Sequence, residues 1–224
     1  LLDSLDVPYF PIGGDSDFGI EKGREWFLEV FHARLPVRDT VYAFTHKGLH
    51  FVMLDPWWRW PDGTLCPSLD GLPGKSVWQI PPHQLLWLEE DLTSNSRFPT
   101  IIAIHCPVHP PTRRLSFANY WDVCTLQNSD LLLQVLQRHP QVKAIFSGHV
   151  HEHYIVKSHG ILQIVTNRLT DYPVEYRVVD VFDDRMEIST RGLSRDFLPK
   201  NHVLRSRKAQ PVEELDRSIT LRFL

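Results

Sequence analysis

Two short apolar runs, each ending beside a histidine, limit the possible folds of this chain most strongly. Residues 100–104 lead directly into His105, and residues 142–146 lead into the segment 147–151. Each run follows a segment with helical periodicity, residues 82–94 and 126–138 respectively. This alternation predicts parallel strands with helices packed on the faces of the sheet. Because the carboxyl ends of parallel strands meet at one edge, we expect these histidines to face a common crevice.

The rest of the chain predicts further elements around this unit. A helix is expected over residues 21–34, with one buried face made up of Trp26, Phe27, Val30 and Phe31. Further strands are expected at 7–12, at 41–45 and 49–54 as a hairpin around Lys47-Gly48, and at 153–158, 161–166, 174–182 and 185–190. Because the last four follow one another without a helix, they predict a second, more antiparallel sheet. The expected architecture is a layered α/β sandwich.

Composition narrows the class of protein. Hydrophobic residues make up 42% of the chain and the formal net charge is −3, so a core can form and no broad basic face is available for nucleic acid. No apolar run approaches the about 18 residues of a membrane span. The three cysteines form no CxxC, which argues against a disulfide framework or a thiolate zinc site and favours a cytoplasmic location. The first residue is Leu1 and not methionine, and we expect the natural start to lie upstream.

Residues 56–81 form a tryptophan-rich connection that also contains many Pro and Gly residues. A connection of this length in a compact domain is usually functional or disordered, and the aromatic residues argue against disorder. The group Trp57-Trp58-Arg59-Trp60 has two interpretations, which the sequence leaves equal. It is either a lid over the crevice, suited to stacking or to a cationic head group, or a buried anchor or oligomer contact.

The candidate functional residues lie where predicted strands end. Gly148-His149-Val150-His151 is the most specific signal, because alternate side chains of an extended segment point the same way and both imidazoles then face one centre or two adjacent ones. Two surface histidines that alternate by chance are the alternative. His105 taken alone is more often a hydrogen-bonded structural residue. Asp15, in Gly14-Asp15-Ser16-Asp17, is either a turn residue or an oxygen ligand.

Together, Asp15, His105, His149 and His151 would supply one oxygen and three imidazole nitrogens. This donor set suits a divalent transition metal such as Mn, Fe, Zn or Ni, and it does not suit Ca²⁺. His109 and His153 lie beside these motifs and are candidates to support them. The remaining histidines, at positions 32, 46, 50, 83, 139, 159 and 202, show no such pattern and are interpreted as structural or solvated.

Three of these segments resemble blocks of the calcineurin-like metallophosphoesterases. Residues 8–17 resemble the family's strand leading into GNHD, Ile104-His105-Cys106-Pro107 resembles its single-histidine block, and residues 147–151 match GHxH in full. Residues 51–55 and 84–88 resemble stretches of the cyclic-nucleotide and glycerophosphodiester phosphodiesterase branch.

The resemblance implies a metallophosphatase-like α/β/β/α sandwich of mixed sheets over residues 1–190. This domain would be N-terminally incomplete and would correspond to the C-terminal two-thirds of the family's domain. From residue 191 to 224 the chain is charged and less periodic. We expect this segment to be an arm that lies over the domain or contacts a partner.

The resemblance further implies a metal-dependent phosphoesterase, a hydrolase acting on a small phosphomonoester or phosphodiester. In the family, two ions hold a bridging hydroxide that attacks phosphorus in line. Carried over to this chain, Asp15, His105 and His149 would bind the second ion, and His151 would bind the first.

The same resemblance gives candidate catalytic residues, which are Asp15, Asp17 and Arg113. Arg113 and Arg114 follow His105 and could reach a phosphate, although a solvated basic loop is the alternative interpretation of this pair. The expected partner is a small phosphate ester, with no nucleic acid polymer and no membrane span. The oligomeric state is left open.

The sequence departs from the family at several points. Ser16 stands where the family has the histidine of GNHD, and Asp15 stands where it has asparagine. The DxH and GDxxD blocks have no counterpart, so two ions are expected only if upstream ligands exist. We therefore keep a second hypothesis, a catalytically inactive binding or scaffold protein of the same fold, and a third, a hydrolase with a single metal ion.

Overall fold

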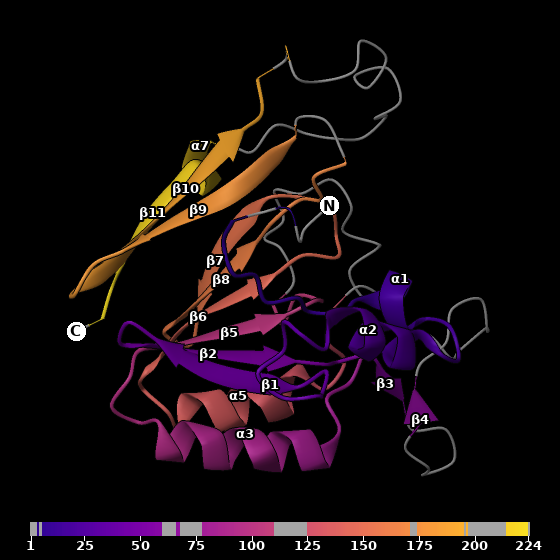
Figure 1. The fold of residues 1–224 in the computed structure, drawn as a ribbon. Helices are drawn as coiled ribbons and strands as arrows, with labels where there is room; N and C mark the ends of the chain where they lie inside the picture. Colours follow the sequence, from indigo (N-terminus) through magenta and orange to yellow (C-terminus); the bar gives the residue numbers. More distant parts are fainter. Residues whose placement is uncertain are drawn as a thin grey trace.

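Two sheets form the frame of the molecule (Figure 1). The computed structural model describes residues 4, 6–59, 66–67, 78–109, 125–170, 174–194, 196 and 214–223. The larger sheet has six strands in the order β1-β2-β5-β6-β8-β7, and the smaller has three in the order β11-β10-β9. A short two-stranded ribbon of β3 (Trp58–Arg59) and β4 (Cys66–Pro67) lies apart from both.

The centre of the larger sheet is parallel, as the strand and helix order predicts. Strands β2, β5, β6 and β8 are paired in parallel, and the two outer strands are antiparallel to their neighbours. The strands are β1 (Tyr42–His46), β2 (Leu49–Leu54), β5 (Thr100–Ile104), β6 (Val142–Ser147), β7 (Tyr154–Ser158) and β8 (Ile161–Val165). The crossover helices are α3 (Pro82–Ser94) and α5 (Ser129–Gln137).

At each edge of this sheet, a two-residue turn joins the antiparallel edge strand to its neighbour. Lys47 and Gly48 have φ of 47° and 80°, and His159 and Gly160 have φ of 52° and 82°. Positive φ at both central residues is what a tight hairpin needs to match the twist of its strands, and glycine adopts it without strain. The predicted hairpin around Lys47-Gly48 is therefore confirmed.

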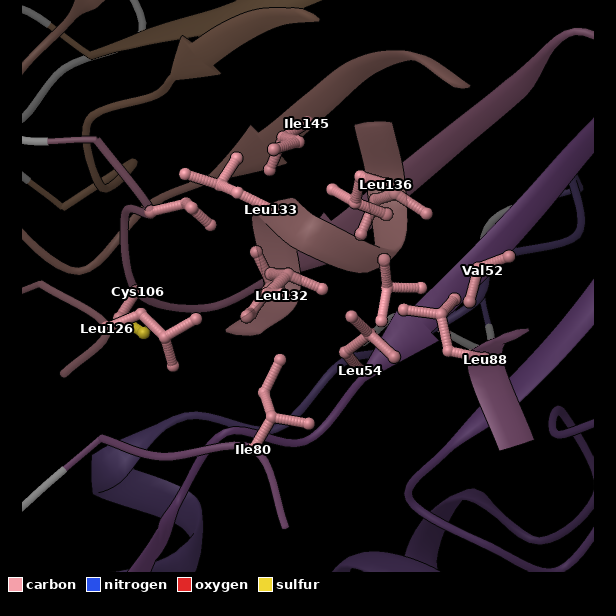
Figure 2. Packing of buried hydrophobic residues seen from close by; sticks show 14 of the residues in the cluster. Val52, Leu54, Ile80, Leu88, Cys106, Leu126, Leu132, Leu133, Leu136 and Ile145 are labelled. Carbon is pink, nitrogen blue, oxygen red and sulfur yellow. The ribbon is translucent and has the colours of Figure 1, made fainter. Parts of the chain in front are cut away.

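Helices α3 and α5 cover one face of the six-stranded sheet, and the three-stranded sheet lies on the other side (Figure 1). The core under the helices combines strand residues such as Val52 and Leu54 with Leu88 of α3 and Leu132 of α5 (Figure 2). A second core lies between the sheets and contains Leu49, Ile101, Ala144, Leu162, Ile164, Met186 and Ile188. These layers confirm the metallophosphatase-like mixed α/β sandwich. In the described part of the chain, the layers are one of helices, formed by α3 and α5, followed by the six-stranded sheet and the three-stranded sheet.

The smaller sheet consists of β9 (Glu175–Val181), β10 (Arg185–Gly192) and β11 (Ser218–Arg222), all antiparallel. The prediction of a second antiparallel sheet is thus confirmed. Strand β11, preceded by α7 (Glu214–Arg217), pairs with β10 at the edge of this sheet. The boundary at residue 190 remains a prediction, but residues 218–222 belong to the sheet.

Two expectations at the N-terminal side are wrong. Residues 7–12 form no strand, since Pro8 and Pro11 have no N–H to donate to a sheet ladder. The predicted helix is present as α2 (Gly23–Phe31), but it buries only part of the expected face. Phe27 is buried, whereas Trp26 and Val30 are 53% and 69% exposed. Periodicity identified the helix but could not tell how much of its apolar face the rest of the molecule buries.

Short helix α1 (Asp15–Phe18) stands where the sequence predicted a turn. The tryptophan-rich segment contributes to the core, because Trp57 and Trp78 are 2% and 3% exposed. For Trp57 the anchor interpretation applies, while Trp60 lies outside the described residues. No helix in the described part of the chain has the length and apolar character that crossing a membrane would require.

Candidate metal centre

Three of the predicted ligands come together at the carboxyl edge of the six-stranded sheet. Their ligand atoms, one each from Asp15, His105 and His149, all lie within 4.8 Å of one another. His105 Nε2 is 3.2 Å from Asp15 Oδ1, and His149 Nδ1 is 3.7 Å from Asp15 Oδ2. The carboxylate thus lies against both imidazoles.

The backbone fixes the two histidines relative to each other. His105 follows β5 directly, His149 lies two residues after the neighbouring β6, and the Gly148 N–H donates to the His105 carbonyl at 2.9 Å. Gly14 packs directly against the imidazole of His105, because a Cβ there would lie 2.5 Å from its Cε1. Glycine is therefore required at this close approach, and it brings Asp15 to the histidine.

The electrostatics of the site favour an ionised carboxylate. Burial by itself raises the pKa of Asp15, but hydrogen bonds and charge interactions with His105 and His149 outweigh it. The pKa of Asp15 is therefore held well below its usual range. The three side chains are partly accessible, with 31%, 24% and 14% exposure for Asp15, His105 and His149. An anionic oxygen beside two accessible imidazoles is the pattern of a cation site.

His151 does not join these three residues, and the reason is local. His149 and His151 have φ of 64° and 54°, so the segment bends through left-handed conformations that non-glycine residues rarely adopt. The prediction that this segment is extended is therefore wrong, whereas the prediction that the two rings face one centre or two adjacent ones stays a prediction. His149 faces Asp15, whereas His151 is exposed. A role for His151 as a metal ligand stays a prediction.

The other candidate catalytic residues differ in what the structure describes. Asp17 is exposed, and its Oδ2 accepts the Gly14 N–H at 2.9 Å, which stabilises the start of α1. Ser16 is exposed on the same short helix. Arg113 and Arg114 lie outside the described residues. Catalytic roles for Asp17 and Arg113 remain predictions.

Sequence reasoning missed two buried polar groups that hold the loops around this site. Asp55, 1% exposed at the end of β2, accepts Arg24 Nε at 2.8 Å, Arg24 Nη2 at 3.0 Å and Thr40 Oγ1 at 2.9 Å. Gln163 of β8 accepts the N–H groups of Val108 and His109, both at 2.8 Å. The signal was present in each case, since a polar residue ends or interrupts an apolar run.

The residues present fit a divalent transition metal. Two imidazole nitrogens and one carboxylate oxygen form a borderline donor set, and these ligands lie close enough to contact one ion. The close approach of Gly14 to His105 shows that the backbone is shaped around these ligands. In the described part of the chain, no other group of three His, Cys, Asp or Glu residues meets the same distance criterion.

Comparison with known proteins supports this interpretation. No protein-family model matches the chain. The chain is 32% identical over 123 residues to a manganese-dependent ADP-ribose/CDP-alcohol diphosphatase of Xenopus tropicalis, a match covering 52% of this chain and 34% of the frog protein. It is 40% identical over 76 residues to a 3',5'-cyclic-nucleotide phosphodiesterase of Nostoc, covering 34% of this chain and 26% of that protein. The matched regions thus span about a third or less of these relatives.

Among solved structures, the chain resembles a dimetal phosphatase from Danio rerio with a TM-score of 0.56 at 20% identity. The match covers 83% of this chain and 61% of that one, and it supports the fold. These findings confirm the resemblance to the calcineurin-like metallophosphoesterases that the strand-end motifs predicted.

Proposed function

We propose that the chain forms the metal-binding part of a phosphoesterase that hydrolyses a small phosphomonoester or phosphodiester. The observation that carries this proposal is the convergence of Asp15 of α1 with His105 and His149 at the carboxyl edge of the sheet, where their ligand atoms lie within 4.8 Å of one another. When bound there, a divalent ion supplies electrophilic activation of the phosphate ester. We propose Mn²⁺ as the ion, because the frog relative is named manganese-dependent.

The residues of this chain would divide the work by their chemistry. His105 and His149 would donate neutral nitrogen ligands, and Asp15 would add an oxygen that stays ionised over the physiological pH range. The relatives' names suggest two substrate classes, nucleotide diphosphates such as ADP-ribose and cyclic nucleotides. Arg113 is our candidate for contacting the phosphate, and His151 for a second ion if further ligands exist. A cytoplasmic location remains our prediction from the cysteine pattern.

The test combines metal content with turnover. The chain is freed of metal by a chelator and titrated with Mn²⁺ by calorimetry, and hydrolysis of an aryl phosphate monoester and diester is then measured with Mn²⁺ present. We expect Mn²⁺ binding and turnover in the wild type. We expect His149→Ala to weaken binding by at least about tenfold and to abolish turnover, since one of three ligands is lost.

His46→Ala is the matched control, because His46 is an exposed histidine at the end of β1, beside the hairpin turn at the opposite edge of the sheet. Its metal affinity and turnover should equal those of the wild type. Metal binding without turnover would favour the inactive binding protein of the same fold. If the wild type binds no Mn²⁺, Zn²⁺, Ni²⁺ or Fe²⁺, the metal-centre proposal is wrong.

A further inference from the structure

We propose that Trp78 is a positioning residue that holds the rings of both histidine ligands, an inference that rests on the proposed metal centre. Trp78 belongs to the tryptophan-rich segment, and the function proposed above assigns it no role. It is 3% exposed and lies in the core cluster that includes Ile104 and Cys106. Its position on the site side of that cluster distinguishes it from an ordinary core tryptophan.

Trp78 contacts both imidazoles with its ring. It is stacked on His105 with centroids 5.4 Å apart and planes 29° apart, and it meets His149 edge-on at 4.5 Å and 63°. The two imidazoles are themselves 5.1 Å apart. The indole therefore forms one wall shared by both ligands. Gly14 also packs closely against the His105 imidazole.

The backbone under Trp78 is fixed from two neighbouring segments. The Trp78 carbonyl accepts the Gln127 N–H at 2.8 Å, and the Gln79 N–H donates to the Pro56 carbonyl at 2.7 Å. Two residues after Trp78, the Asn128 side chain pairs with both backbone groups of Ile80. It accepts the Ile80 N–H at 3.0 Å and donates to the Ile80 carbonyl at 2.8 Å. The indole is thus presented to the site by a rigid support.

Trp57 also packs against Trp78. The centroids of the two rings are 4.2 Å apart, and Trp57 is 2% exposed. A large buried aromatic ring has few orientations available in such packing. Trp78 can therefore restrict the ring orientations of His105 and His149 before an ion binds, and it covers one side of the site with an apolar surface. Both effects strengthen metal binding without adding a ligand.

The test measures metal affinity directly. We expect Trp78→Leu to weaken Mn²⁺ binding by about tenfold, within the range found when groups that support metal ligands are removed. Trp78→Phe keeps an aromatic face but is too small to cover both imidazoles, and we expect its affinity to lie between those of wild type and Trp78→Leu. Binding is measured by calorimetry, and the absorption spectrum of the Co²⁺ form is recorded to report the coordination geometry.

Trp87→Leu is the control, because Trp87 of α3 packs against the same core cluster and no contact with either ligand ring is described for it. We expect it to lower thermal stability while leaving Mn²⁺ affinity and the Co²⁺ spectrum unchanged. If Trp78→Leu does not fold, Trp78→Phe carries the test. A folded Trp78 variant that binds Mn²⁺ as tightly as the wild type, with an unchanged Co²⁺ spectrum, would overturn the inference. Failure of the wild type to bind metal would instead overturn the proposed function.

Discussion

At the scale of single residues, the candidate centre depends on contacts that leave no room for other side chains. Gly14 is the sharpest case, because its Cα lies against the imidazole of His105. The backbone of His149 is also unusual, because this residue has a left-handed φ and its side chain lies against Asp15. Such strained backbone is retained where surrounding structure enforces it, often at functional sites. Small changes at these positions should therefore affect the ligands before they affect the fold.

The first prediction concerns Gly14→Ala. The added Cβ would lie 2.5 Å from His105 Cε1, so the ring must shift from its present position beside Asp15. We expect Mn²⁺ affinity to fall by at least about tenfold, measured by calorimetry. Gly192→Ala is the control, because its nearest neighbours lie at 3.5 Å, an ordinary contact distance. Equal Mn²⁺ affinities for Gly14→Ala and the wild type would show that the close approach is not needed.

At the scale of elements, an ion pair between the partly buried Arg24 and the buried Asp55 joins α2 to the end of β2. Arg24 donates two hydrogen bonds to Asp55 and a third, from Nη2, to the Trp57 carbonyl at 2.7 Å. Its guanidinium also lies 4.5 Å from the Phe18 ring and 4.4 Å from the Trp58 ring. One side chain thereby connects α1, α2 and the start of the tryptophan-rich segment. This explains why a helix that leaves Trp26 and Val30 exposed is still held in place.

The second prediction concerns Arg24→Met. It leaves the Asp55 carboxylate buried without its counter-charge, and we expect a loss of about 3–5 kcal/mol in the free energy of unfolding. Urea denaturation followed by circular dichroism measures this loss. The double variant Arg24→Met with Asp55→Asn should recover a substantial part of it, because the buried charge is removed. A double variant as unstable as Arg24→Met would mean that packing, and not charge, sets the cost.

At the scale of the whole molecule, the two sheets are joined by an apolar core and by a buried polar cluster. In that cluster His153 Nε2 is 3.6 Å from Glu175 Oε2, and Arg217 pairs with Glu175 at 3.4 Å. Asp216 accepts the Ile155 N–H at 2.8 Å, which ties the C-terminal segment to β7. Residues 218–222 are themselves a strand of the second sheet, and Asp216 ties this strand to the larger sheet.

The third prediction follows from the pKa of His153. Burial, with Arg177 and Arg217 nearby, lowers it to about 4. Glu175 would favour the charged ring, but Arg217 already pairs with that carboxylate. The unfolded chain takes up a proton near pH 6.5 and the folded chain does not, so stability should be complete above about pH 6.5 and fall toward pH 4. The expected loss is on the order of 3 kcal/mol.

This loss is measured by urea denaturation at a series of pH values. His153→Gln is the informative variant, because it removes the titrating ring while keeping a polar side chain. Its unfolding free energy should depend much less on pH between about 6.5 and 4 than that of the wild type. If both proteins lose stability in parallel over this range, His153 is not the responsible group.

Much of the fold could be predicted from local patterns. The apolar runs identified β5 and β6, and Lys47-Gly48 identified the hairpin, because hydrophobic period and turn chemistry are properties of adjacent residues. The placement of His105 and His149 at strand ends followed from the parallel order, whereas Asp15 lies in α1 and follows no strand. The prediction of a strand at 7–12 was wrong because prolines have no N–H to donate to a sheet. The prolines were a local signal, but the prediction gave more weight to the apolar run.

The sequence by itself therefore determined the order of the elements, the parallel sheet and the edge at which the ligands gather. Only the tertiary structure decided which of those ligands meet. It separated His151 from the others through two left-handed residues, placed Gly14 against His105 and brought Trp78 onto both imidazoles. The physical reason is that local pattern sets which face a residue presents, whereas contact between residues 14, 78, 105 and 149 depends on packing between segments distant in the chain.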